Sequence, residues 1–272
     1  MIQCGRMARI VILLHRHGVY EPMGYLIEAI SQVWRQNGDD VRVSFGPGER
    51  AEGDVCIQHV DLTRVPDDHT AYATQFPIQV NVKTTDISKS VYSDRILSRE
   101  HTYDGPVIVK TDRNCRGMPE FRLETRGLLE SAGYRPIRDY PVYESLRAVP
   151  NRAWETPGLI VERFVAERRD GFYCLRTWVF LGDRETNSLS YSREPVVKAA
   201  NIVRREVVSE VPEELRKTRR EMGFDFGKFD YAIEDGKVVL YDVNRTPSFA
   251  PLAPDITRAS AERLAGGLKA FL

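Results

Sequence analysis

The chain has 272 residues, of which 42% are hydrophobic and 29% charged, and its 39 Lys and Arg residues balance 39 Asp and Glu residues. This composition does not fit intrinsic disorder, and a net charge of zero argues against a protein that coats nucleic acid or an anionic membrane. The length predicts two domains or one large α/β unit.

The apolar runs and the cysteines predict a cytoplasmic protein. Ile10–Leu14, the longest apolar run near the start, is too short for a signal-peptide core or a membrane span. The four cysteines lie far apart in the sequence, and no Cys-x-x-Cys pair is present. We therefore expect reduced thiols and no zinc ribbon.

The first 85 residues predict a small open α/β domain with a parallel sheet. Arg9–Leu14 is a continuous aliphatic run, typical of a strand that is buried on both faces. Pro22–Asn37 carries apolar residues at helical spacing, and Gly38 follows it. Further β-rich runs are Val41–Phe45, Asp54–His59 and Pro77–Val82. No GxGxxG motif follows the first strand, which argues against a dinucleotide site.

A second region begins at Asp86, which we expect to cap a helix that carries Ile87, Val91 and Ile96. Gly-Pro then precedes a strand at Val107–Lys110, and Pro119–Ser131 has a helical pattern with Pro at its first position. The segment from Tyr134 to Trp154 gives only strand fragments and turns.

The last third predicts longer strands. The runs Leu159–Val165 and Phe172–Leu181 are typical of strands, and Pro212–Met222 is typical of a helix with acidic residues first and basic residues last. Phe229–Glu234 and Lys237–Asn244, joined by Asp-Gly, give the strongest hairpin signal in the chain.

This hairpin carries three oxygen-bearing side chains that suit a metal ion. Asp242 and Asn244 are two residues apart and therefore point to one face. A two-residue turn would place Asp230 on the opposite face, whereas a three-residue loop would place it on the same face. Three oxygen ligands on one face would suit Mg²⁺, and solvated polar positions on an ordinary hairpin are the alternative.

Three basic residues occupy positions that suit an anion. Lys110 ends the strand that Gly-Pro introduces, where it is placed to meet a phosphate or to face water. Arg176 lies in mid-strand among aromatic residues, so it either pairs with a structural carboxylate or meets a bound anion. Lys228 precedes Asp230 by two residues and shares its face.

The order GPVIVK, LIVERFV, YCLRTWVFLGD and GKFDYAIEDGKVVLYDVNRTPS resembles the ATP-grasp superfamily of carboxylate–amine ligases, including the ATP-binding domain of glutathione synthetase. The resemblance spans roughly residues 86–250. It implies an α/β fold that becomes α+β toward the C-terminus. The implied parts are an N-terminal open parallel domain (residues 1–85), a lid subdomain (86–158) and a C-terminal antiparallel-sheet subdomain (159–272).

The resemblance also implies a set of site residues. Those expected to bind ATP are Lys89, Lys110, Val161, Glu162, Phe164, Val165, Glu167, Asp170, Lys198 and Asn201. Within this set the two early lysines are assigned to phosphate, the residues from Val161 to Val165 to adenine, and Glu167 or Asp170 to the ribose. The metal ligands are Asp230, Asp242 and Asn244, and the catalytic residues are Arg176 and Lys228. The loop TDRNCRGMPE after Lys110 has a single glycine where the superfamily usually has several.

The resemblance implies an ADP-forming ligase that uses ATP and Mg²⁺, with Mn²⁺ as an alternative metal. A small-molecule carboxylate would attack the γ-phosphoryl group to give an acylphosphate, which an amine would then displace. Neither nucleic acid nor membrane is implied as a partner, and a homodimer is left open. We expect the acceptor to lie near the ends of the N-terminal strands, where His15, Arg16, His17, His59 and Asp61 follow.

Three other functions fit parts of the sequence. An ATP-grasp kinase would use the same ATP and metal residues but leave no free phosphate. A metal-dependent hydrolase would use His15 and His17, although the (β/α)₈ repeats that usually accompany such a site are not present. A nucleotide-binding module without catalysis would not need the three metal ligands.

Overall fold

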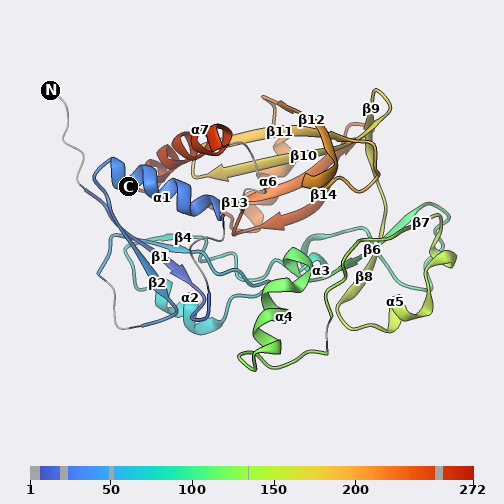
Figure 1. Cartoon of the computed structure of the whole chain (residues 1–272), viewed down its shortest axis with the longest axis horizontal. Helices are drawn as coiled ribbons and strands as arrows, with labels where there is room; N and C mark the ends of the chain where they lie inside the picture. Colours follow the sequence, from blue (N-terminus) through green and yellow to red (C-terminus); the bar gives the residue numbers. More distant parts are fainter. Residues whose placement is uncertain (1–6, 19–23, 49–51, 134, 249–253) are drawn as a thin grey trace.

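The computed structural model describes residues 7–18, 24–48, 52–133, 135–248 and 254–272. Within these residues the strands form three sheets (Figure 1). In Figure 1 the N-terminal sheet lies at lower left, a middle sheet at lower right, and the largest sheet across the top. The fold is a mixture of parallel α/β and antiparallel parts, as the sequence predicts.

The N-terminal sheet is parallel, with the order β2-β1-β3-β4. Its elements are β1 (Arg9–Leu14), α1 (Leu26–Gln36), β2 (Asp40–Phe45), β3 (Val55–Gln58), α2 (Asp67–Ala73) and β4 (Ile78–Val80). Alternate residues of β1 enter two different cores. Ile10 and Ile12 pack in the core that contains α1, whereas Val11 and Leu13 pack with Tyr72 of α2. This explains why the run reads as continuously apolar.

The middle sheet has the order β5-β8-β6-β7 and antiparallel pairing. Its region contains α3 (Lys89–Tyr92), β5 (Ile96–Leu97), β6 (Val107–Thr111), η1 (Asn114–Gly117), α4 (Met118–Thr125), β7 (Val142–Tyr143), η2 (Leu146–Ala148), α5 (Asn151–Glu155) and β8 (Leu159–Arg163).

Three expectations for this region are corrected. The helix expected to carry Ile96 is a single turn, and Ile96 belongs to β5 instead. The residue that precedes the turn is Ser88 and not Asp86, whose carboxylate accepts the Ser88 N–H. The helix expected to reach Ser131 ends at Thr125, and Gly127 follows with a φ of 68°. Because β8 pairs with β5 and β6, the middle sheet extends to Arg163, beyond the boundary expected at residue 159.

The largest sheet is antiparallel, with the order β12-β11-β10-β13-β14 and β9 added on β10. Its region contains β9 (Glu167–Arg169), β10 (Phe172–Leu181), β11 (Arg184–Ser192), η3 (Ala199–Asn201), β12 (Ile202–Val207), α6 (Glu213–Glu221), β13 (Phe226–Glu234) and β14 (Lys237–Asn244). Trp178 and Phe180 on one face pack in the core that contains Leu215 of α6, and Val179 and Leu181 on the other face join the core of the N-terminal sheet.

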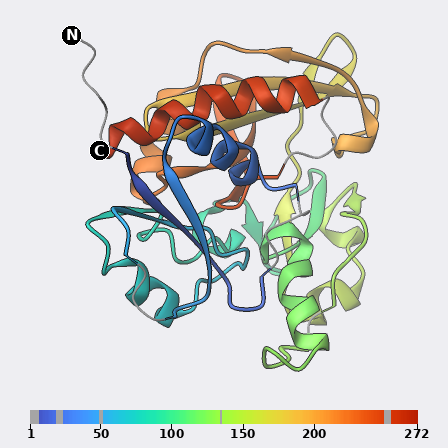
Figure 2. The ribbon, with the colours of Figure 1, turned by 60° about the vertical axis from the view of Figure 1, so that its left-hand side comes forward.

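Helix α7 covers the largest sheet, and helix α1 packs against α7 and the N-terminal sheet. Figure 2 shows α7 (Pro254–Ala265) lying along this sheet with α1 beside it, and the short helix η4 (Gly266–Ala270) follows α7. The indole N–H of Trp34 on α1 donates to the carbonyl of Ala265 at 2.9 Å. The start of the expected helix at Pro22 lies outside the described residues.

Two buried polar side chains fasten the N-terminal sheet to the largest one. The side-chain oxygen of Asn81, just after β4, accepts hydrogen bonds from the N–H groups of Asp225 and Phe226, both at 2.9 Å. Arg245, which follows β14 of the largest sheet, is fully buried. Its guanidinium donates to the carbonyls of Leu62, Thr63 and Thr84 in the N-terminal part of the chain. These contacts join the N-terminal sheet to the largest sheet, although the strands of the two sheets are more than 80 residues apart in the sequence.

Among the described cysteines, Cys56, Cys115 and Cys174 are free thiols, whereas Cys4 lies outside the described residues. A search of the described helices finds none with the length and apolar character needed to cross a membrane.

Candidate functional site

A β-bulge brings the two hairpin carboxylates to one face. Glu234 pairs with Lys237 across a two-residue turn, whose residues both have positive φ. A regular ladder from this turn would pair Asp230 with Tyr241. Instead the register shifts, Tyr241 is the extra residue, and Asp230 lies directly opposite Asp242. The expectation that a two-residue turn separates the two carboxylates is therefore wrong for this hairpin.

Each carboxylate is held by a lysine from a different part of the chain. The ammonium of Lys228 lies 2.7 Å from Asp230, which also accepts the hydroxyl of Thr177 at 2.9 Å. Lys89, on α3, lies 3.0 Å from Asp242 and is almost fully buried. Burial raises the pKa of Asp242, but the nearby lysines outweigh it, and the net pKa lies below its usual value. Asp242 is therefore ionised at neutral pH.

A second ion pair lies in the middle sheet beside this cluster. Lys110 on β6 donates to Glu162 on β8 at 3.0 Å and to the Tyr241 carbonyl at 2.8 Å. Arg95 lies 3.5 Å from the same Glu162 oxygen. Burial raises the pKa of Glu162, but the charges of Lys110 and Arg95 lower it below its ordinary value. The other oxygen of Glu162 is buried and has no hydrogen-bond partner among the described residues.

These groups line a cavity of about 530 Å³ between the middle sheet and the largest sheet. Eight of the predicted site residues line it: Lys89, Lys110, Glu162, Phe164, Val165, Lys198, Asp230 and Asp242. The described lining also contains seven basic side chains against three carboxylates; the basic ones are Lys89, Arg95, Lys110, Arg116, Arg138, Arg163 and Lys198. This excess of positive charge in a concave site suits a polyanionic ligand.

The segment from Pro195 to Ala200 forms one wall of the cavity. Within it, the Lys198 ammonium lies 2.6 Å from Asp139, a residue of the middle region. Asn201 acts on the backbone of this segment, since its side-chain oxygen accepts the Lys198 N–H at 2.8 Å and its amide donates to Glu194. Asn201 does not line the cavity, so the structure gives it a supporting position.

Arg176 and Glu167 lie away from the carboxylate pair. Arg176 is opposite Tyr231 in the sheet, so it lies on the other face from Asp230. Its guanidinium makes two bonds to Glu167, at 2.8 and 2.9 Å, and both side chains are buried. Of the two alternatives for Arg176, the structure therefore shows a partnership with a carboxylate. Neither the catalytic role expected of Arg176 nor the ribose role expected of Glu167 has support from this geometry.

Four other predicted residues do not line the cavity. Asp170 is an exposed turn residue with a φ of 50°, and Val161 is buried in the core of the middle sheet. Lys228 is engaged with Asp230, as described above. Asn244 is buried, and its side-chain oxygen accepts the N–H of Thr246 at 2.8 Å. This oxygen is therefore turned toward the backbone that follows β14.

The donor chemistry of Asp230 and Asp242 suits a hard divalent cation. Two facing carboxylates supply the oxygen ligands that Mg²⁺ uses together with phosphate oxygens. In the part of the chain that the structure describes, no group of three or more His, Cys, Asp or Glu side chains is placed to hold a metal. The pair alone would thus leave most coordination positions to a ligand and water.

Sequence reasoning missed several cavity residues. Arg116 lies in the loop after Lys110 and Arg163 lies in LIVERFV, but the resemblance gives neither arginine a role, and Arg138 and Tyr140 lie in the region that gave no clear elements. Just before α4, Cys115 and Arg116 beside this cavity both adopt positive φ, of 46° and 60°. Such backbone outliers are common at functional sites but cannot be read from residue types alone.

The histidines do not form a metal centre in the described chain. His15 stacks on His69 with ring centroids 5.4 Å apart, and His17 lies 5.7 Å from His15. Burial lowers the pKa of His15 to about 4. His59 is buried against Tyr25, and the carboxylate of Asp61 accepts the hydroxyls of Tyr25 and Thr246.

No protein-family model matches the chain, and neither does any curated protein sequence. Solved structures match it over nearly its whole length. D-cycloserine synthetase DcsG aligns with a TM-score of 0.55 and 12% identity over 95% of this chain and 98% of its own. A RimK-domain ATP-grasp protein from Sphaerobacter thermophilus aligns with a TM-score of 0.51 and 11% identity, over 95% and 99%. The macrocyclase MdnC from Microcystis aeruginosa, bound to its precursor peptide, aligns with a TM-score of 0.50 and 10% identity, over 94% and 99%. With three sheets in this arrangement and these structural neighbours, the chain has the ATP-grasp fold.

Proposed function

We propose that the protein is an ATP-dependent ligase that binds Mg·ATP in the cavity between its middle sheet and its largest sheet. The observation that supports this most directly is the meeting of Lys89, Lys110, Asp230 and Asp242 beside one cavity of about 530 Å³. These four residues come from four different elements, and the fold is needed to bring them together. The structural neighbours named as synthetases or macrocyclases support the same class of reaction.

In this proposal the phosphates lie at the lysine and carboxylate end of the cavity. Lys89 and Lys110 are buried and positioned by ion pairs, so they offer charge at fixed positions. Lys198 lies on the opposite wall and is more exposed, which allows it to approach a phosphate from the solvent side. Asp230 and Asp242 would hold Mg²⁺, which would neutralise charge on the β- and γ-phosphates.

The adenine would lie at the end formed by Ile108, Glu162, Phe164 and Val165. Ile108 and Phe164 supply apolar surface, and the free oxygen of Glu162 is placed to accept a hydrogen bond from an amino group. The Val165 carbonyl already accepts the hydroxyl of Tyr241 at 2.6 Å. That contact fixes the chain segment that leaves β8, against which the base would pack.

The reaction we propose has two steps. A substrate carboxylate oxygen attacks the γ-phosphorus of ATP, and the bond from phosphorus to the β,γ-bridging oxygen breaks, giving an acylphosphate and ADP. An amine then attacks the acyl carbon, phosphate leaves, and the amine loses a proton. The chain contributes mainly by position and charge, and Lys228, at 2.7 Å from Asp230, keeps that carboxylate oriented.

Thermal unfolding with and without Mg·ATP tests this proposal. Ligand at 100 times its Kd stabilises a protein by about 2.7 kcal/mol, which corresponds to several degrees at this size. We expect a magnesium-dependent rise in Tm for the wild type and a much smaller one for Asp242→Asn. Asp235→Asn, at the exposed tip of the same hairpin, is the matched control and should behave like the wild type.

Product analysis then separates a ligase from a kinase. A ligase supplied with its carboxylate and amine releases ADP and free phosphate in equal amounts, whereas a kinase releases ADP alone. Absence of any shift with millimolar Mg·ATP in the wild type would refute the nucleotide site itself.

A further inference from the structure

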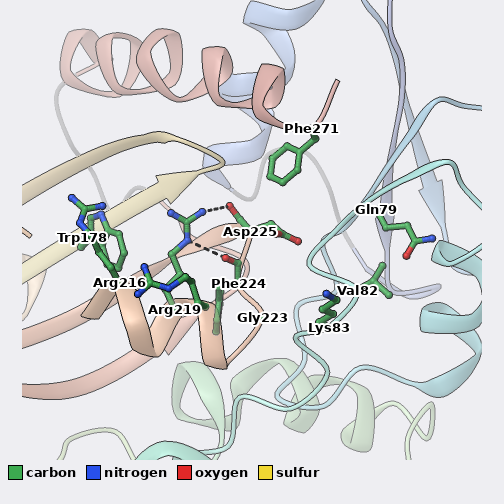
Figure 3. Close-up of a pocket in the computed structure, with 11 residues that line it drawn as sticks. Gln79, Val82, Lys83, Trp178, Arg216, Arg219, Gly223, Phe224, Asp225 and Phe271 are labelled. Carbon is green, nitrogen blue, oxygen red and sulfur yellow. Dashed lines mark hydrogen bonds between the residues drawn. The ribbon is translucent and has the colours of Figure 1, made fainter. Parts of the chain in front are cut away.

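A second cavity, of about 500 Å³, lies where the N-terminal sheet meets α6 (Figure 3). Figure 3 shows Val82 and Lys83 on one side, Arg216 and Arg219 on the other, and Phe271 above them. The residues that line this cavity are different from those that line the proposed ATP cavity. It is therefore a separate concave site, within the range of volumes that small ligands occupy.

The described lining of this cavity is strongly basic. It contains Lys83, Arg216, Arg219 and Arg220 against the carboxylate of Asp225. Two of these guanidinium groups have carboxylate partners next to the cavity, since Arg216 bonds Glu185 and Arg220 bonds Glu213. The charges of Lys83 and Arg219 are not compensated in this way.

Arg219 is held by neutral groups. Its guanidinium donates to the carbonyls of Gly182, Phe224 and Asp225 at 2.8 to 3.0 Å. Its charge also lies 4.0 Å above the ring of Phe180. Within the described residues no carboxylate lies at ion-pair distance from it, and burial lowers its pKa to about 10. The carboxylates of Asp225 and Glu185 act on this charge only from beyond ion-pair distance, and an anion in the cavity would give it a direct partner.

Lys83 faces Arg219 across the cavity in Figure 3. Its side chain is exposed, and it makes no hydrogen bond or ion pair to any described residue. The end of α6 approaches Lys83 closely, because a Cβ on Gly223 would lie only 2.6 Å from the Cβ of Lys83. The backbone and Cβ of Lys83 are thus held against the end of α6, while its ammonium stays free to contact a ligand in the cavity.

The remaining walls are apolar. Trp178 and Phe224 are buried beneath the arginines, and Val82 and Phe271 close other sides. A bare inorganic ion would leave the accessible parts of Val82 and Phe271 in contact with water. We propose that this cavity binds a small organic anion, a carboxylate or phosphate monoester attached to an apolar ring, with Lys83 and Arg219 contacting the anionic group. This inference is independent of the proposed reaction with ATP.

Calorimetric titration of the full chain with phenyl phosphate, benzoate and inorganic phosphate tests the proposal. We expect at least one of the two organic anions to bind at one site per chain, at least tenfold more tightly than inorganic phosphate. The better of the two identifies the anionic group. Lys83→Ala should weaken this binding at least fivefold. Lys217→Ala, on the same helix but outside the cavity, is the matched control and should not change it.

A further variant excludes binding in the other basic cavity. Lys198→Ala changes only the proposed ATP cavity and should leave the titration unaltered. The proposal is overturned if neither organic anion binds at millimolar concentration, or if inorganic phosphate binds equally well. It is also overturned if Lys83→Ala has no effect, or if Lys198→Ala rather than Lys83→Ala weakens the binding.

Discussion

Replacing Glu167 with Ala should destabilise the protein strongly, without a specific effect on nucleotide binding. The Glu167 carboxylate accepts two bonds from Arg176, one from Arg169 and one from the Ile233 N–H, all between 2.8 and 2.9 Å. Its side chain and that of Arg176 are 4% and 5% exposed. Removing one partner of a buried ion pair leaves the other charge uncompensated, at a cost of about 3–5 kcal/mol. At about 2–4 °C per kcal/mol for a chain of this size, Tm should fall by roughly 6–20 °C.

Chemical denaturation and calorimetry measure this loss, and three comparisons sharpen it. Asp170→Asn, at the exposed turn of the same hairpin, should leave stability almost unchanged, because Asn tolerates the φ of 50° at this position as Asp does. The double variant Glu167→Ala/Arg176→Met should recover much of the loss, because no buried charge is then left without a partner. A Glu167→Ala protein of unchanged Tm but with weakened ATP binding would refute this reasoning and restore the ribose role.

Three other perturbations follow from the structure. Gly267→Ala should lower the free energy of unfolding by more than about 2 kcal/mol, since its Cβ would lie 1.9 Å from the Leu181 carbonyl oxygen; a wild-type urea midpoint would contradict this. Asn81→Ala should cost about 2–4 kcal/mol by leaving the partly buried N–H of Asp225 and the buried N–H of Phe226 without acceptors, whereas Gln79→Ala, at an exposed position, serves as control. Burial raises the pKa of Glu185, but its bonds from Arg216 outweigh this and lower the net folded pKa. The resulting stabilisation is complete above the unfolded pKa of about 4.3 and is lost as pH falls through the folded pKa. Glu185→Gln should therefore flatten the acid limb of a stability–pH curve, and an unchanged limb would oppose this assignment.

The elements with strong local patterns were predictable from the sequence. The strands Arg9–Leu14 and Phe172–Leu181 have the predicted bounds, because uninterrupted apolar or alternating runs leave few other structures. The strand Arg184–Ser192 was not predicted, since its Ser and Asn residues give little hydrophobic contrast. It forms because every one of its residues pairs with β10, and such tertiary pairing overrides local preference.

The residues of the candidate site likewise divide into those that the sequence predicts and those that it does not. Lys110, Asp230 and Asp242 could be placed because each lies on a strand within a recognisable motif. The face of Arg176 could not be related to that of Asp230, because their relative register is set by pairing between two strands that are distant in the sequence. Arg116 lies in the distorted short helix η1 and Arg138 lies outside any helix or strand, and the course of both segments depends on the assembled fold.

Tyr241 has two separable consequences for the hairpin. If it were deleted, Leu240 would still pair with Tyr231 and Asp242 with Asp230, so the carboxylates would keep their common face. The deletion would instead remove two hydrogen bonds between the largest sheet and the middle region. The Tyr241 carbonyl accepts one from Lys110, and the Tyr241 hydroxyl donates one to the Val165 carbonyl. Tyr241, as one extra residue in a regular strand, thus adds a connection across the cavity and leaves the two carboxylates on the same face. The distance by which the middle sheet and the largest sheet can separate should therefore depend on Tyr241.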